Sequence, residues 1–150
     1  MSLHQDIKKQ MIGALKAKDT LRLNVIRGLL SAFTNEAVSK KRKPDEALSD
    51  EEALVVISRA VKQRKDSIEQ FEKGGRPELA EVEKSELAIL GTYLPTQMSR
   101  EEVVVFIKKK QVELNMDKSK KGQFMGIIMK DLNGQADGSM VKEIIDSLFS

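Results

Sequence analysis

The sequence predicts an all-α protein, and three observations lead to this fold class. Apolar residues recur at steps of three and four along nearly the whole chain, which is the spacing of one helix face. No segment shows the sustained alternation of apolar and polar residues that is typical of a half-buried strand. Aromatic residues make up only 4% of the 150 residues and Trp is absent, so aliphatic side chains and Met must fill the core. Such side chains suit packed helices better than a sheet.

Two helices are expected at the start of the chain, followed by an exposed loop. The helices are predicted over residues 3–15 and 21–33, where apolar residues recur at helical spacing. The stretch KKRKPDEALSDEE comes next, and it is polar and contains a proline. Polar, proline-containing stretches between periodic segments are typical of loops.

The third and fourth expected helices have recognisable ends. Ser49 and Glu52 have the spacing of a capping box, so the third helix is expected to begin there. It is expected to end at Gly74–Gly75, because glycine adopts the left-handed turn that closes a helix at little cost. Pro77 favours the first turn of the fourth helix, which is predicted to run to about residue 93. Its inward residues are expected to be Leu79, Val82, Leu87 and Leu90.

The stretch YLPTQMSREE marks a predicted domain boundary. Pro95 disfavours helix at the residue before it, and Ser99 with Glu102 forms a second capping-box pattern. The expected organisation is an N-terminal domain of about four helices over residues 1–95 and a three-helix tail domain over residues 96–150. Helices of the tail are predicted over residues 99–114, 124–132 and 140–149.

The glycine-rich segment KKGQFMGIIMKDLNGQADGSMVKEII invites a test for ligand binding. A phosphate-binding P-loop needs the pattern GxxxxGK[ST], which neither Gly122 with Gly126 nor Gly134 with Gly138 supplies. A calcium loop begun at either of two positions lacks the turning glycine or the bidentate glutamate. The sequence therefore excludes both kinds of site in this segment.

The remaining interpretation of this segment is a structural turn between two helices. Gly134 is expected to close one helix, and either Asp137 or Ser139, beside Gly138, is expected to cap the next. The two earlier glycines lie one helical turn apart, where they would allow another backbone to approach closely.

Chemical groups for catalysis are scarce. The absence of Cys excludes disulfides, thiolate metal sites and a cysteine nucleophile. The one His, His4, lies in a first helical turn and is expected to be an exposed bystander rather than a catalytic group. Acidic clusters occur in first turns, where negative charge complements the helix dipole. We therefore expect no catalytic residues, no metal site and no cofactor.

The N-terminal sequence bears on location. MSLHQDIKKQM has charges where a signal peptide needs an uninterrupted apolar stretch, and no run approaches the roughly 18 apolar residues of a membrane span. The interpretation is a cytoplasmic protein without a membrane partner.

Basic residues of the third helix form the best candidate binding surface. The net charge is only +3, but Arg59, Lys62 and Lys65 lie within about two turns of one helix. Arg64 lies where the apolar stripe of that helix is interrupted, so it is either a side chain that covers the core with its methylenes or a fixed guanidinium beside a groove. Aromatic residues are not interleaved with these cations, so any RNA would be recognised by shape and phosphate. The alternative that each basic cluster is only a solvated surface stays open.

Three stretches carry a resemblance to a known family. VISRAVKQRKDSIEQFEKGGRPELAEVEKSELAILGTYLPTQMSREE, KKGQFMGIIMKDLNGQADGSMVKEIIDSLF and NVIRGLLSAFTNEAV resemble the GatB/YqeY family, and the likeness extends over nearly the whole chain. It implies an all-helical fold with an N-terminal domain and a small three-helix tail. In GatB, a subunit of glutamine-dependent aminoacyl-tRNA amidotransferase, the related module is a tail that helps to hold tRNA.

The resemblance also bears on activity. In that enzyme, phosphorylation and amide transfer belong to another domain and glutamine hydrolysis to the GatA subunit. The resemblance therefore implies a stand-alone binding protein without catalysis. It also implies that any family-level link to carbon–nitrogen ligases that use glutamine as amide donor is inherited from the larger GatB subunit. The residues expected to bind RNA are Arg59, Lys62, Arg64, Lys65, Arg76, Lys118, Lys120 and Lys121.

The predicted function is thus a non-catalytic tRNA-binding or tRNA-associated protein. The alternative is a protein-interaction module or accessory subunit, docking to an amidotransferase-type partner through an apolar groove between the two domains. A third possibility, an enzyme, would require a deep pocket with converging Glu and Lys side chains.

Overall fold

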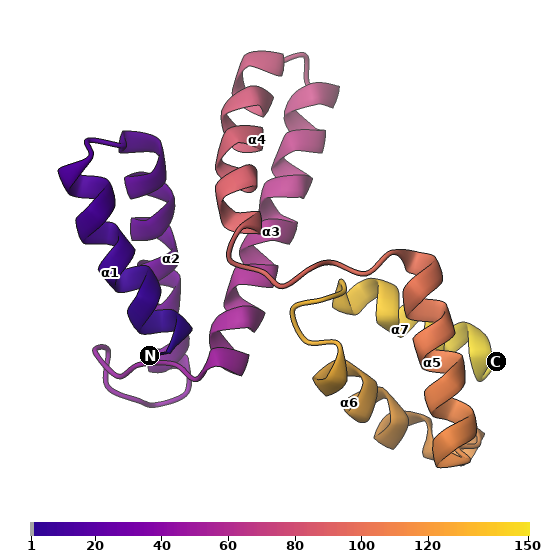
Figure 1. The fold of residues 1–150 in the computed structure, drawn as a ribbon. Coiled ribbons are helices and arrows are strands. Elements are labelled where there is room, and N and C mark those ends of the chain that lie inside the picture. Colours follow the sequence, from indigo (N-terminus) through magenta and orange to yellow (C-terminus); the bar gives the residue numbers. More distant parts are fainter. Residues whose placement is uncertain (1) are drawn as a thin grey trace. The chain divides into compact units, whose positions relative to one another are not determined.

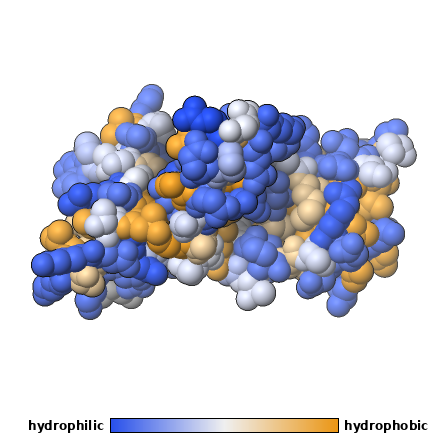
Figure 2. All heavy atoms as spheres, turned by 90° about the horizontal axis from the view of Figure 1, so that it is seen from above, coloured by the Kyte–Doolittle hydropathy of each residue, from blue (hydrophilic) through white to orange (hydrophobic). Residues whose placement is uncertain are grey.

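The computed structural model describes residues 2–150 and confirms the prediction of an all-α protein (Figure 1). Over these residues the chain forms seven α-helices and one 3₁₀ helix, and no residue of 2–150 lies in a strand. It divides into two compact units, Met1–Leu94 and Pro95–Ser150. On the face shown in Figure 2, hydrophobic residues lie in small patches among hydrophilic ones.

The first unit consists of two helical hairpins. The four helices are α1 (Leu3–Lys16), α2 (Thr20–Ser39), α3 (Asp50–Lys73) and α4 (Pro77–Gly91). Helix α1 packs mainly on α2 and α3 packs mainly on α4, while α3 and α4 both contact α2.

One apolar core joins the two hairpins. Ile7 of α1, Phe33 of α2, Ile57 of α3 and Leu90 of α4 are almost fully buried in it. Burial of such side chains contributes roughly 1.5–3 kcal/mol each. Val82 was expected to face inward, but its side chain is 52% exposed, so this prediction is wrong. Its apolar spacing fits the stripe of α4, yet no other helix of the unit covers that position.

The second unit is a separate small bundle with its own core. Its helices are α5 (Arg100–Leu114), η1 (Lys118–Lys120), α6 (Lys121–Asp131) and α7 (Gly138–Leu148). The 3₁₀ helix η1 was not predicted. The buried residues include Val103 and Ile107 of α5, Phe124 and Ile128 of α6 and Ile145 of α7.

The predicted capping boxes are confirmed. The Ser49 hydroxyl accepts from the Glu52 N–H at 3.2 Å, and the Glu52 carboxylate accepts from the Ser49 N–H at 3.0 Å. Ser99 and Glu102 form the same pair of bonds at the start of α5. These bonds satisfy backbone donors that have no partner within the helix.

The glycine turns agree in part with expectation. Gly75, with φ of 73°, takes the left-handed conformation after α3, whereas Gly74 does not, and Gly134 takes it after α6 with φ of 79°. Asp137 caps α7 by accepting from the Ser139 N–H at 3.0 Å, and Gly138 is the first residue of that helix.

The expectation of a close backbone approach at the two glycines of α6 is wrong. A Cβ atom built on Gly122 or Gly126 would meet nothing within 4 Å among the described residues. These positions therefore face open space.

Candidate functional site

The basic residues predicted to bind RNA fall into two groups. Arg59, Lys62, Arg64 and Lys65 lie in the middle of α3, and Arg76 is the residue before α4. The remaining three belong to the second unit: Lys118, Lys120 and Lys121.

Arginines of the first group are engaged with carboxylates. Arg59 Nη1 lies 3.2 Å from a carboxylate oxygen of Glu36 in α2. Arg76 Nε lies 2.9 Å from Glu78, and this bond lowers the pKa of the Glu78 carboxyl. A carboxylate this close reduces the positive field that the arginine presents to a phosphate.

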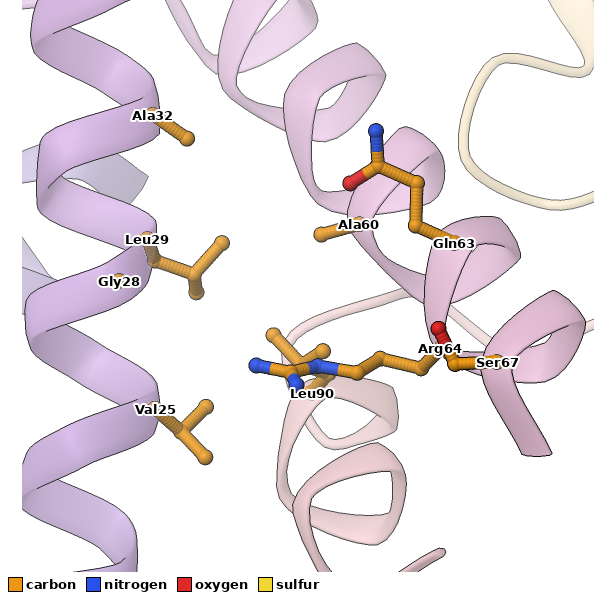
Figure 3. Close-up of a pocket in the computed structure, with 9 residues that line it drawn as sticks. All are labelled: Val25, Gly28, Leu29, Ala32, Ala60, Gln63, Arg64, Ser67 and Leu90. Carbon is orange, nitrogen blue, oxygen red and sulfur yellow. The ribbon is translucent and has the colours of Figure 1, made fainter. Parts of the chain in front are cut away.

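Arg64 is the most strongly held of these side chains. Its Nη1 atom lies 2.9 Å from Glu83 and 2.5 Å from Glu86, both on α4. Figure 3 shows the side chain extending from α3 toward α2, next to Leu90. The arginine therefore joins α3 to α4 and also borders the space between these helices and α2.

That space is a groove of about 340 Å³ within the first unit (Figure 3). Its volume is near the lower end, roughly 300 Å³, of small-molecule sites. Small residues on α2 and α3 leave the groove open, while larger aliphatic residues are buried beneath it. The lining residues are Val25, Gly28, Leu29, Ala32, Ala60, Gln63, Arg64, Ser67 and Leu90.

The groove is suited to binding rather than to chemistry. Arg64 is the one ionisable group among its lining residues, and two carboxylates already accept from it. Neither a nucleophile with an adjacent base nor a general acid lines it. The apolar part of its lining can receive an aliphatic or aromatic group, and Gln63 and Ser67 add polar groups.

Several lysines, by contrast, remain available to a ligand. Lys65, Lys118 and Lys120 are exposed and form no ion pair with any residue of 2–150. Lys121 is different, because its ammonium lies 2.7 Å from Asp146 of α7 and lowers the pKa of that carboxyl. It therefore serves to join α6 to α7.

The basic loop after α2 is partly structural. Arg42 Nη1 lies 2.7 Å from Glu52, and Lys40 Nζ lies 3.5 Å from the other oxygen of the same carboxylate. The hydrogen bond from Arg42, followed by that from the Ser49 backbone, lowers the pKa of Glu52 to about 2. The sequence predicted the capping role of Glu52 but not its ion pairs with Arg42 and Lys40, because these pairs depend on how the loop folds back onto α3.

His4 is not the exposed bystander that the sequence suggested. Its side chain is half-buried, and Nδ1 accepts from the Leu48 N–H at 2.9 Å. The ring lies 4.8 Å from that of Phe33, measured between centroids. Burial, and then the charge of Lys8, lower the pKa of the imidazole. Sequence spacing could not reveal this contact, because its partner lies 44 positions away.

Residues 2–150 contain neither a metal-binding cluster nor a membrane-spanning helix. No group of three or more His, Asp or Glu side chains is placed to hold a metal ion in this range. Nor does any helix of this range have the length and hydropathy needed to cross a membrane.

The sequence matches one described family over almost its full length. Residues 4–149 match the family described as "Yqey-like protein". The match includes both groups of candidate residues and the groove.

Fungal proteins named "Altered inheritance of mitochondria protein 41, mitochondrial" are similar to this chain. The protein from Lachancea thermotolerans is 45% identical over 62% of this chain and 46% of its own length. That from Kluyveromyces lactis is 42% identical over 68% of this chain and 52% of its own length. That from Clavispora lusitaniae is 31% identical over 99% of this chain and 85% of its own length. The match thus spans about half the length of the first two relatives.

These names contradict the expectation of a cytoplasmic protein. The relatives are named as mitochondrial. The expectation failed because a charged N-terminal stretch and a lack of long apolar runs suit more than one compartment.

Proposed function

Because the chain belongs to the Yqey-like protein family, we propose that it is a non-catalytic binding protein that associates with tRNA or with a complex that handles tRNA. The observation that carries the proposal is the pair Lys118 and Lys120 on η1. Both are exposed and lie within 4.0 Å of no carboxylate of residues 2–150. The hydrogen bond from Ser119, and then the charge of Lys120, lower the pKa of the nearby Asp117 carboxyl. They lie in the unit whose sequence resembles the tRNA-holding tail of GatB.

The same unit carries two further exposed cations. Lys108 and Lys109 of α5 are also exposed and outside any ion pair of the described chain. Lysines that contact phosphates release condensed counterions, so the binding is expected to depend steeply on salt and weakly on sequence.

A second candidate is a protein-interaction module, and the groove beside Arg64 favours it. Its partly apolar lining, with an arginine already held by two carboxylates, offers a site for a side chain of a partner. An accessory subunit of an amidotransferase-type complex would use such a site without catalysing a reaction.

The first test is fluorescence anisotropy with total tRNA over a salt series. The variant Lys118→Gln/Lys120→Gln is expected to weaken binding and to reduce the slope of log affinity against log salt by about 2, since two phosphate contacts are lost. The matched control is Arg59→Gln/Arg76→Gln, which removes two cations that carboxylates already occupy. This control is expected to change affinity much less.

Two outcomes would overturn the RNA proposal. One is an absence of wild-type binding at low salt, and the other is equal loss of binding in both double variants. The first would leave the protein-interaction module as the remaining candidate, and the second would show a response to total charge alone.

A further inference from the structure

One face of α1 combines lysines with exposed aliphatic side chains. Lys8, Lys9, Ile12, Leu15 and Lys16 follow the spacing i, i+1, i+4, i+7 and i+8, which places them on one side of a helix. All five are exposed, with Ile12 at 52% and Leu15 at 58%. The core-facing residues of α1 lie on its other side, so this face belongs to the surface of the first unit.

The face is strongly cationic. Lys8, Lys9 and Lys16 form no ion pair within residues 2–150, and Lys18 is exposed in the turn that follows α1. Residues 1–27 contain six Lys or Arg and two Asp, so their net charge of +4 exceeds the +3 of the whole chain. Charge complementarity therefore calls for an anionic partner.

The aliphatic residues decide between anionic partners. A phosphate backbone offers nothing apolar to Ile12 or Leu15. Lysine is depleted at protein–protein interfaces, which disfavours an acidic protein. Lysines around aliphatic side chains on a helix suit the boundary between lipid headgroups and acyl chains.

We propose that this face of α1 binds the surface of an anionic lipid bilayer. The helix lies in the plane of the surface, where Lys8, Lys9 and Lys16 contact lipid phosphates and Ile12 and Leu15 enter the acyl boundary. With 14 residues, α1 is about 21 Å long, so the contact is peripheral. The sequence-based expectation of no membrane partner considered spanning segments, and a peripheral face needs none.

The test is cosedimentation with large vesicles of phosphatidylcholine alone or of phosphatidylcholine and phosphatidylglycerol in equal parts. Wild-type protein is expected to bind the anionic vesicles and not the neutral ones. Lys8→Glu/Lys9→Glu/Lys16→Glu is expected to weaken partitioning on the order of a hundredfold or more. Ile12→Gln/Leu15→Gln leaves the charge unchanged and is expected to weaken it roughly tenfold.

Matched variants control for net charge and surface hydrophobicity. Lys41→Glu/Lys43→Glu/Lys130→Glu makes the same change in charge at other exposed positions. Val38→Gln/Val82→Gln removes two aliphatic side chains that are 51% and 52% exposed on other helices. Both controls are expected to bind like wild type. A thermal unfolding curve, followed by circular dichroism, that matches the curve of the wild-type protein shows that a variant is folded.

Each alternative outcome overturns the proposal. Binding that is lost with the lysines but unaffected by Ile12→Gln/Leu15→Gln indicates a phosphate polyanion such as RNA. Equal binding to neutral vesicles indicates no role for charge, and no binding to anionic vesicles excludes the lipid surface. The result is separate from the tRNA test, because the two experiments change different residues.

Discussion

At the scale of single residues, two side chains connect segments that are distant in sequence. His4, at the start of α1, accepts a hydrogen bond from the backbone N–H of Leu48, which lies just before α3. Glu52, at the beginning of α3, forms ion pairs with Arg42 and Lys40 of the basic loop. Both contacts depend on protonation state, so they make stability depend on pH in two different ranges.

His4 is expected to reduce stability as the pH falls below its ordinary pKa of 6.5. Nδ1 must be unprotonated to accept from Leu48, and folding lowers the pKa of the imidazole. The unfolded chain therefore binds the proton more readily, so this contribution is fully present above 6.5 and is lost as the pH falls through the folded pKa.

The measurement is the free energy of unfolding in urea between about pH 7.5 and about pH 5. His4→Asn provides the control, because its side-chain oxygen can accept the same bond without titrating in this range. The variant is expected to lose the decline seen in wild type. An identical decline in both proteins would show that His4 is not its source.

Glu52→Gln is expected to destabilise the protein by about 1–2 kcal/mol, since it weakens a helix cap and removes two ion pairs. Folding lowers the pKa of Glu52 to about 2, so its contribution is present above the ordinary 4.5 and is lost between 4.5 and 2. Thermal denaturation at neutral pH measures the loss. Glu101→Gln, in the first turn of α5 but outside the capping pair, should change stability much less.

At the scale of elements, helix ends were predictable because their signals are local. A capping box needs two residues three positions apart, and both expected ones are present. The exposure of Val82 and the 3₁₀ helix at Lys118–Lys120 were not predictable in this way. They depend on which neighbouring helix covers a face and on how α5 and α6 are joined.

Two glycines provide a matched test of backbone freedom. Gly28 lies inside α2 and a Cβ atom there would meet nothing within 4 Å, so Gly28→Ala is expected to stabilise by about 0.5–1 kcal/mol. Gly75 has φ of 73°, so Gly75→Ala is expected to destabilise by about 1 kcal/mol. Urea denaturation of both variants measures the difference. Changes of the same sign would contradict this account.

At the scale of the whole molecule, we propose that the predicted N-terminal and tail domains, residues 1–95 and 96–150, fold as separate units. Each of the two compact units has its own core, which includes Phe33 in one and Phe124 in the other. Domains with separate cores can unfold in separate transitions.

Phe124→Ala is expected to destabilise the second unit by about 3–5 kcal/mol and to leave the first unchanged. The single tyrosine, Tyr93, lies in the first unit, where its hydroxyl donates to Gln10 at 2.9 Å. Tyrosine fluorescence therefore reports on the first unit, while circular dichroism reports on both. In urea, the variant should keep the wild-type midpoint of the fluorescence transition, whereas part of its helical circular dichroism signal should be lost at a lower urea concentration. A shift of both signals together would show a single cooperative unit.

The candidate site was less predictable than the fold. The sequence suggested a guanidinium beside a groove as one reading of Arg64, but it could not identify Glu83 and Glu86 as its partners. Those carboxylates lie 19 and 22 positions away and meet it only because α3 and α4 pack side by side. A charge read from the sequence is therefore no measure of the charge offered to a ligand.

The loop between α2 and α3 has a practical consequence for protein engineering. Its ends are held by the Arg42–Glu52 pair and by the bond from Leu48 to His4, while residues 43–47 between them are exposed. An inserted epitope or fluorophore-binding peptide at this position would be anchored on both sides. The same loop would also suit new chain termini in a circularly permuted protein.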